Sequence, residues 1–262
     1  MEMSSSSVPL VIDDPNLSHA WARAFLQIID NPGKEISPLV ISVAGFQNGK
    51  LTEDESIRNA LDTTLSLKGE QSINTVANTI FPSSLWKRSR YDRQELYRRY
   101  TSILPRAMAM EKHKNSNGLY FERLIAFGTG PQGGNQLEHI ILEYRGRPGV
   151  RKSMFQASIF DPKRDHSRSA QIPFPCLQHV SFVPDSQKSI LTLNAFYATQ
   201  QLFNKAYGNY LGLCRLGFFM SQEMGLDFSR MNCFIGVEKL EKVGKRDNAL
   251  DSVVQIAREA IC

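Results

Sequence analysis

Apolar residues recur every three or four positions between residues 17 and 30, and this spacing predicts an amphipathic helix. Asn16 is expected to cap its first turn, and the Asn-Pro-Gly sequence at residues 31–33 to end it. Its apolar positions are Leu17, Trp21, Ala24, Phe25, Ile28 and Ile29. The Ser-rich stretch before the helix has no such period, so we expect residues 1–15 to form a flexible tail.

The following segments alternate between strand-like and helix-like patterns. Residues 36–43 are rich in β-branched side chains and predict a buried strand, whereas residues 53–67 predict a second helix that begins in an acidic turn. Residues 92–112 again have helical spacing, and Pro105 is expected to interrupt that helix. Two shorter segments follow, residues 136–144, which fit a helix or a strand, and residues 150–160, which fit a strand.

The last third of the chain contains the longest apolar pattern. Strands are expected over Val180–Val183, Ile190–Phe196 and Phe228–Val237, and a terminal helix over Ala249–Ile261. Residues 199–224 predict a long helix whose apolar side chains lie on overlapping faces, which favours a position at the centre of a domain. The pattern therefore predicts an α+β fold, with a large mixed sheet packed against a long central helix, in a single domain over residues 16–262.

Charge and composition narrow the classes of partner and compartment. The chain has 262 residues, a net charge of +5 and a pI near 9.0, which favours an anionic partner. No apolar run reaches the roughly 20 residues that cross a bilayer, and no signal peptide precedes the first helix, so we expect a cytoplasmic protein that does not insert into membranes. The cysteines have neither metal-site nor disulfide-framework spacing and are expected to be reduced; they are Cys176, Cys214, Cys233 and Cys262.

Two motifs have a functional and a structural interpretation. Basic and aromatic residues interleave between residues 87 and 100, which would suit an RNA-binding face, but a solvated helix face has the same composition, and no nucleic-acid motif accompanies it. Gly128, Gly130 and Gly133 fit the G-x-G-x-x-G spacing of a phosphate-binding loop. The preceding apolar run is short and no acidic residue ends a second strand, which favours a connecting loop instead.

The segment Pro173–Phe182 places Cys176 just before an expected strand, and it resembles the nucleophile segment of thymidylate synthases and pyrimidine-nucleotide hydroxymethylases. Further matching pieces occur in the family's order, and they are Asn135-Gln136-Leu137, Arg151-Lys152, Phe160-Asp161-Pro162 and Asn209. The resemblance covers roughly residues 118–240 and implies a thymidylate synthase-like fold. It also implies a homodimer that forms through one face of the sheet.

The resemblance implies a defined chemistry for Cys176. A thiolate adds to C6 of a pyrimidine, and C5 then becomes nucleophilic enough to accept a one-carbon unit. In the family the donor is 5,10-methylenetetrahydrofolate, the acceptor is a pyrimidine nucleotide or nucleoside, and the product carries a methyl or a hydroxymethyl group. A buried cysteine that acts only as a small apolar side chain is the alternative for this residue.

The same resemblance assigns roles to other side chains. Tyr120 and Asn78 take the positions of active-site residues, and the residues expected to bind substrate are Asn209, Arg168, Thr199, Ser181, Arg151 and Lys152. Asn209 would read the base through its amide, and Arg168 would bind phosphate or favour the thiolate. Each also has an ordinary structural interpretation, as a core aromatic, a helix-packing asparagine or a solvated charge. No metal site is expected.

Several family positions carry different residues in this chain. Leu177 replaces the histidine after the nucleophile, Ala198 replaces a phosphate-binding arginine, and Gln201 replaces an aspartate. The ribose-binding element corresponds to Asn232–Gly236, which contains neither histidine nor tyrosine. These differences leave three hypotheses: a divergent pyrimidine C5-modifying enzyme, a protein with a different substrate on the same scaffold, and a catalytically inactive nucleotide-binding or protein-interaction module.

Overall fold

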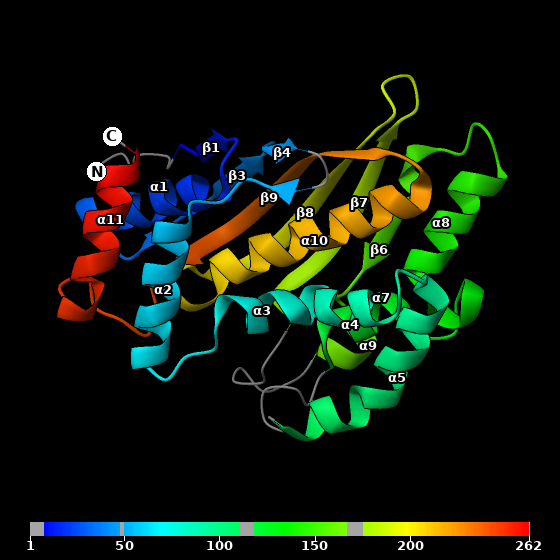
Figure 1. Cartoon of the computed structure of the whole chain (residues 1–262), viewed down its shortest axis with the longest axis horizontal. Helices are drawn as coiled ribbons and strands as arrows, with labels where there is room; N and C mark the ends of the chain where they lie inside the picture. The colour runs from blue at the N-terminus through cyan, green and yellow to red at the C-terminus, as the bar shows by residue number, and fades with distance from the viewer. Residues whose placement is uncertain (1–7, 48–49, 111–117, 167–174, 262) are drawn as a thin grey trace, which may run out of the picture.

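The computed structural model describes residues 8–47, 50–110, 118–166 and 175–261. Their main feature is a seven-stranded mixed sheet (Figure 1). In spatial order its strands are β1 (Leu10–Asp14), β3 (Leu39–Val43), β9 (Asp227–Lys239), β8 (Ile190–Gln201), β7 (Leu177–Asp185) and β6 (Gln156–Ser158), and β2 (Glu35–Ile36) pairs with β9. The β1/β3 and β8/β9 pairs are parallel and the others antiparallel. The large mixed sheet and the α+β class expected from the sequence are confirmed.

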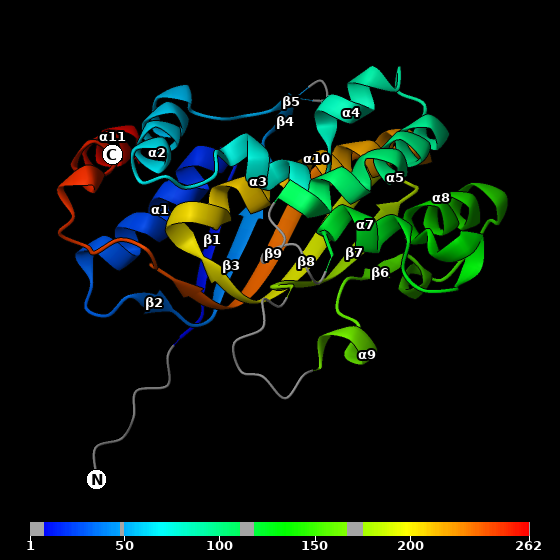
Figure 2. The same ribbon diagram turned by 90° about the horizontal axis from the view of Figure 1, so that it is seen from below.

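Apart from the short α9, the described helices gather on one face of this sheet (Figure 2). Helix α1 contacts β1 and β3, α10 contacts β8 and β9, and α7 and α8 contact β6. The helices are α1 (Leu17–Asp30), α2 (Glu55–Leu67), α3 (Ile73–Ile80), α4 (Ser83–Arg88), α5 (Arg93–Met110), α7 (Tyr120–Ile125), α8 (Gln136–Gly146), α9 (Pro162–Asp165), α10 (Tyr207–Met224) and α11 (Asp251–Ile261). Short helical turns cover Pro131–Gly134 (η1), Lys152–Met154 (η2), Leu202–Ala206 (η3) and Asn248–Leu250 (η4), and β4 (Phe46–Gln47) pairs with β5 (Lys50–Leu51).

Helix α10 lies at the centre of the helical layer. Small residues on α10 let α3 approach its backbone closely. A Cβ atom on Gly208 would lie 2.6 Å from the Cβ of Val76, and one on Gly212 would lie 2.8 Å from the carbonyl oxygen of Ala77. Both distances are shorter than ordinary van der Waals contact. Helix α3 therefore packs against α10 at a separation that larger residues at these two positions would prevent.

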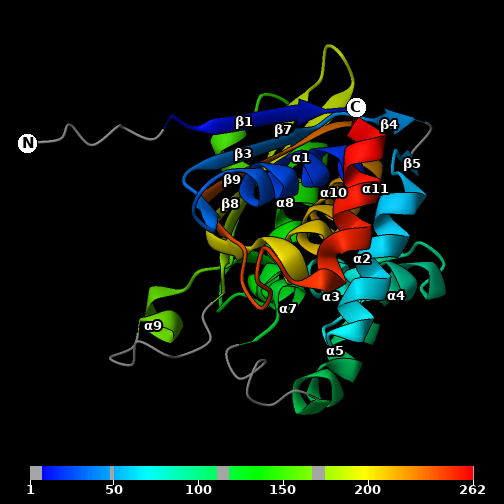
Figure 3. The ribbon, with the colours of Figure 1, turned by 90° about the vertical axis from the view of Figure 1, so that its left-hand side faces the viewer.

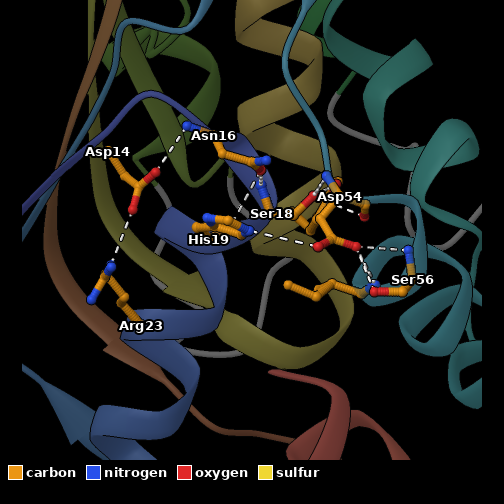
Figure 4. A network of polar contacts seen from close by, with 9 residues as sticks. Asp14, Asn16, Ser18, His19, Arg23, Asp54 and Ser56 are labelled. Atoms are coloured by element: carbon orange, nitrogen blue, oxygen red, sulfur yellow. Dashed lines mark hydrogen bonds and ion pairs between the residues drawn. The ribbon is translucent and has the colours of Figure 1, made fainter. Parts of the chain in front are cut away.

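The start of α1 is fixed by a polar network that also holds the start of α2 (Figure 4). The side chain of Asn16 caps α1 by accepting from the amide of Ser18 at 2.8 Å. The hydroxyl of Ser18 lies 2.7 Å from that of Tyr207 and accepts from the amide of Asp54, which caps α2. Figure 3 shows α11 beside α1 and α2, so the last helix closes this end of the molecule.

Four boundaries differ from the sequence expectations. Residues 10–14 form the edge strand β1 instead of continuing the tail, because Ile12 and Asp14 alternate inward as the strand pairs with β3. Helix α5 continues through Pro105, which is exposed, so the carbonyl group left without a donor faces solvent. The strand expected over residues 150–160 is reduced to β6, with η2 before it.

The fourth difference concerns the long helix. Residues 199–201 belong to β8, and η3 separates this strand from α10, which begins only at Tyr207. Alternate burial along β8 continues through Leu193, Ala195 and Tyr197, so the strand extends well past Phe196. None of the described helices is long and apolar enough to cross a membrane.

Candidate functional site

Cys176 lies immediately before β7, at the end of the sheet where β8 and β9 finish. Its carbonyl oxygen accepts a hydrogen bond from the amide of Ala198 in β8 at 3.2 Å. Because β7 and β8 are antiparallel, the start of β7 faces the last residues of β8. Gln200 of β8 is in turn paired with Glu238 of the parallel strand β9. Strand pairing therefore brings the half-buried Cys176 to one corner of the sheet, where the start of β7 meets the ends of β8 and β9.

Tyr120 reaches the same corner from the first turn of α7. Its hydroxyl forms hydrogen bonds with the backbone of Cys176 and Leu177, and burial raises the pKa of the phenol, so the group stays protonated. One turn further along α7, Arg123 is fully buried and donates to Asp165 at 2.7 Å and to the carbonyl oxygen of Ile159 at 2.8 Å. This ion pair fixes α7, and with it Tyr120, against the segment that leads to β7.

Three further polar side chains are buried at the corner. Gln200 is 2% exposed, Glu238 is fully buried and Asn204, in η3, is 3% exposed. Polar groups this deep normally have hydrogen-bond partners, because removing them from water without one is destabilising. Within the described part of the chain, both amide atoms of Gln200, Oε1 of Glu238 and Oδ1 of Asn204 lack one. The corner therefore presents unused donors and acceptors.

The charges at this corner act on the thiol. Burial raises the pKa of Cys176, the carboxyl groups of Glu241 and Glu238 raise it further, and Lys205 lowers it. All three side chains thus lie within electrostatic reach of the sulfur, and Glu238 acts on it as a charge only in its ionised form. The balance favours the neutral thiol over the thiolate at neutral pH.

Glu238 itself is held in its protonated form. Complete burial raises the pKa of its carboxyl group well above the ordinary value, and the hydroxyl of Tyr210 donates to Oε2 at 3.2 Å. A carboxylic acid that stays neutral at pH 7 can donate a hydrogen bond as well as accept one. With Oε2 occupied by Tyr210, the unpaired Oε1 is where the acid would meet a ligand.

Hydrogen bonds from a neighbouring loop hold the segment that carries these side chains. Asn204 donates through Nδ2 to Glu70 at 3.2 Å, and Lys205 donates to Gln71 at 2.7 Å. Gln201, which follows the buried Gln200, donates to Glu241 at 2.7 Å. The link between β8 and α10 is thereby fixed to the segment that joins α2 and α3.

Two of the residues expected at the site lie in helices that border this corner. Asn209 is 5% exposed in the first turn of α10, between Gly208, which faces α3, and Tyr210, which faces Glu238. Asn78 lies in α3, and its Oδ1 is buried without a hydrogen-bond partner. Helix α3 contacts both η3 and α7, so Asn78 belongs to an element adjacent to Tyr120 and Asn204.

The other expected substrate-binding residues lie elsewhere. Ser181 points to the helix-free face of the sheet, since Val180 and Phe182 on either side of it are buried, and it accepts from Asn194 at 3.4 Å. Thr199 is exposed on β8. Arg151 and Lys152 are exposed at the start of η2, and Arg168 lies outside the described residues. The structure thus brings Tyr120 to Cys176 but leaves Ser181 on the other side of the sheet.

Sequence reasoning missed Gln200, Asn204 and Glu238. The first two fall in the region assigned to the long helix, where polar residues between apolar ones indicate a solvated face. No local signal marks Glu238, because it opens a charged run over residues 238–242 whose composition is typical of a solvated segment. Among the residues that the structure describes, no group of His, Cys, Asp and Glu could hold a metal ion.

No family model matches the chain, and no curated protein matches its sequence.

Proposed function

We propose that the corner around Cys176 binds a pyrimidine nucleotide or nucleoside and that the protein transfers a one-carbon unit to C5 of its ring. One observation supports this above the others: a half-buried thiol shares a corner with buried hydrogen-bonding groups that have no partner among the described residues. Such groups suit the donors and acceptors on the edge of a pyrimidine. A thiol beside them would meet the ring carbon that must be attacked.

The proposed reaction begins at the sulfur of Cys176. The thiol loses its proton, an S–C6 bond forms, and the C5–C6 double bond becomes an enolate whose nucleophilic carbon is C5. C5 would then bond to the methylene carbon of the folate co-substrate and lose its own proton to solvent, and the bond between that carbon and the folate nitrogen would break. Capture of water by the methylene carbon would give the hydroxymethyl product, and hydride from the folate would give the methyl product. The S–C6 bond breaks in the same stage, and the released thiolate takes up a proton to restore the thiol. Tyr120 is proposed to hold the backbone of Cys176 in place through the hydrogen bonds of its hydroxyl.

The one-carbon donor implied by the resemblance is 5,10-methylenetetrahydrofolate, which would act as a co-substrate and supply an electrophilic carbon. No contact among the described residues identifies a folate site, so this part of the proposal rests on the resemblance alone.

A catalytically inactive binding module is the second candidate, and two observations favour it. The raised pKa of Cys176 disfavours the thiolate that the reaction requires. Asn78 stands where the resemblance places a general acid or base, and an amide does not exchange protons near neutral pH. In this case the corner would still bind a pyrimidine but would not modify it.

We also propose that the protein is a homodimer that associates through the helix-free face of the sheet (Figure 2). Phe196 and Phe234 stack there with ring centroids 5.5 Å apart, and they are 38% and 40% exposed. Beside them Asn232 donates to Asn194 at 2.9 Å. An apolar centre with polar neighbours on neighbouring strands suits a two-fold contact between identical surfaces.

The proposed function is tested by tritium release from pyrimidines labelled at C5, with 5,10-methylenetetrahydrofolate present. We expect release from a uracil or cytosine nucleoside or nucleotide, and no release by Cys176→Ser. Cys214→Ser is the matched control, because Cys214 is buried in α10 and should leave the reaction unchanged. Binding of the pyrimidine without tritium release would support the inactive module instead.

A further inference from the structure

The unpaired atoms at the corner define the kind of ligand that would fit it. They are Nε2 and Oε1 of Gln200, Oε1 of Glu238 and Oδ1 of Asn204. Gln200 and Glu238 are partners across the β8/β9 ladder and are both buried, so their side chains share one face of the sheet. Asn204 follows four residues after Gln200, in the turn that leads to α10. All belong to the corner that holds Cys176.

The hydrogen bonds already made determine what remains available. The hydroxyl of Tyr210 occupies Oε2 of Glu238, so the acid proton is available at Oε1 as a donor. Nδ2 of Asn204 is used by Glu70, so its Oδ1 remains as an acceptor. Gln200 contributes one donor group and one acceptor. Together these groups supply both donors and acceptors, and none of them is cationic.

Among the described residues, the charged side chains named beside the unpaired atoms are mostly acidic. Glu70 and Glu241 are hydrogen-bonded to Asn204 and Gln201, next to the unpaired atoms in sequence. Of the charged groups described above, Lys205 supplies the positive charge that acts on the Cys176 thiol, and its ammonium donates to Gln71. A phosphate monoester carries between one and two negative charges at neutral pH and is normally held by arginine or by several backbone amides. Beside these carboxylates it would be repelled.

From this geometry we propose that the ligand read by Gln200, Glu238 and Asn204 is uncharged, a pyrimidine nucleoside or free base without a phosphate. This inference rests on the proposed function and makes its substrate class more specific. Ring amide and carbonyl groups and sugar hydroxyls supply both donors and acceptors, as the unpaired atoms require. Ala198 occupies the position of the family's phosphate-binding arginine. This replacement is consistent with the loss of phosphate recognition.

Calorimetric titration of the full-length protein tests the charge of the ligand. Uridine, cytidine and their deoxy forms are compared with the corresponding 5′-monophosphates and with uracil and cytosine. We expect at least one uncharged compound to bind, and its monophosphate to bind about tenfold or more weakly. Equal or tighter binding of the monophosphate would overturn the inference, and so would a lack of binding by every uncharged compound.

A pair of substitutions tests the role of the unpaired amide. Gln200→Met keeps the side-chain volume but removes both unpaired atoms, so we expect about tenfold or greater loss of nucleoside binding without a fall in melting temperature. Gln136→Met is the contrasting control for stability, because the amide of Gln136 donates to Ser158 and Arg123 carbonyl oxygens, and its loss should lower the melting temperature by several degrees. Gln255→Met, at an exposed position of α11, should change neither nucleoside binding nor the melting temperature.

Unchanged nucleoside binding by Gln200→Met would contradict the role of this residue. A fall in its melting temperature as large as that of Gln136→Met would do the same, because it would show that the amide has a partner within the fold. The inference and the proposed function fail in different ways. Tritium release from a monophosphate alone would refute the uncharged ligand and keep the reaction, whereas nucleoside binding without release would keep the ligand and refute the reaction.

Discussion

Glu238 connects the stability of the fold to the chemistry of the corner. A fully buried carboxyl group with one unpaired oxygen is destabilising in its ionised form, so the fold retains the proton. The folded state therefore binds this proton more tightly than the unfolded chain, in which the pKa is near 4.5. The stabilisation that the bound proton provides is fully present when the pH lies below the pKa of the unfolded chain. It is lost as the pH rises toward the higher pKa of the folded state.

Glu238→Gln should remove this pH dependence, because glutamine can still accept from Tyr210 but cannot ionise. The free energy of unfolding of the variant should exceed that of the wild type increasingly above pH 5, by about 1.4 kcal/mol for each pH unit up to the folded pKa. Urea denaturation of both proteins from pH 5 to 9 measures the difference. Parallel profiles across this range would show that Glu238 does not retain its proton.

Cys176 should react with alkylating agents more slowly than other half-buried cysteines, since the pKa of its thiol is raised. Glu241→Gln removes one nearby negative charge and should accelerate alkylation at pH 7.5 by roughly two- to fivefold, the size expected for one partly screened charge. Lys205→Met should slow it by a similar factor. Site-resolved mass spectrometry after iodoacetamide treatment separates Cys176 from the other cysteines. Equal rates in all three proteins would place these charges out of reach of the sulfur.

At the scale of elements, the contact of α3 with α10 holds the corner in shape. Gly212→Ala should destabilise the protein by about 1–3 kcal/mol, because the added methyl group would lie within 2.8 Å of the carbonyl oxygen of Ala77. Gly146→Ala is the matched control, since a Cβ atom at this position of α8 would meet nothing within 4 Å. Chemical denaturation of the two variants compares them. A Gly212→Ala protein as stable as the control would mean that α3 can move away from α10 without cost.

Most elements could be predicted from periodicity, but the elements that build the corner could not. The helix over Leu17–Asp30 was predicted with its cap, because its apolar period and Asn16 agree. The end of β8 was not, because Leu202, Phe203 and Ala206 have the spacing of a helix and conceal the strand before them. Burial of Gln200 depends on its pairing with Glu238, a contact between residues far apart in sequence that no local pattern contains.

At the scale of the whole molecule, the proposed contact between two copies uses the face of the sheet opposite the main helical layer (Figure 2). Replacing Phe196 and Phe234 together by glutamate should convert a dimer of twice the 29.6 kDa chain mass into a monomer, because two charges would be buried in the proposed contact. Leu67→Glu, on an exposed position of α2, is the control. Light scattering after size-exclusion chromatography gives the mass. A wild-type protein that elutes as a monomer would refute the proposed contact.

The thiol could be predicted from the sequence, whereas the groups around it could not. Cys176 was identified from its flanking residues, and the structure places Tyr120 against its backbone. Ser181 was expected beside it, but alternation along β7 turns this side chain to the opposite face. A shift of one residue along a strand turns a side chain to the opposite face of the sheet. Motif spacing alone does not determine which face the side chain reaches.

The central claim is that Cys176 adds covalently to a pyrimidine ring. Intact-protein mass spectrometry, after incubation with 5-fluorouridine or its monophosphate and 5,10-methylenetetrahydrofolate, tests it most directly, because fluorine at C5 prevents the loss of a proton that completes the reaction. We expect a mass increase equal to one pyrimidine and one folate per chain, mapped to Cys176 and absent from Cys176→Ser. An unmodified wild-type protein under conditions in which calorimetry shows the pyrimidine bound would contradict the account.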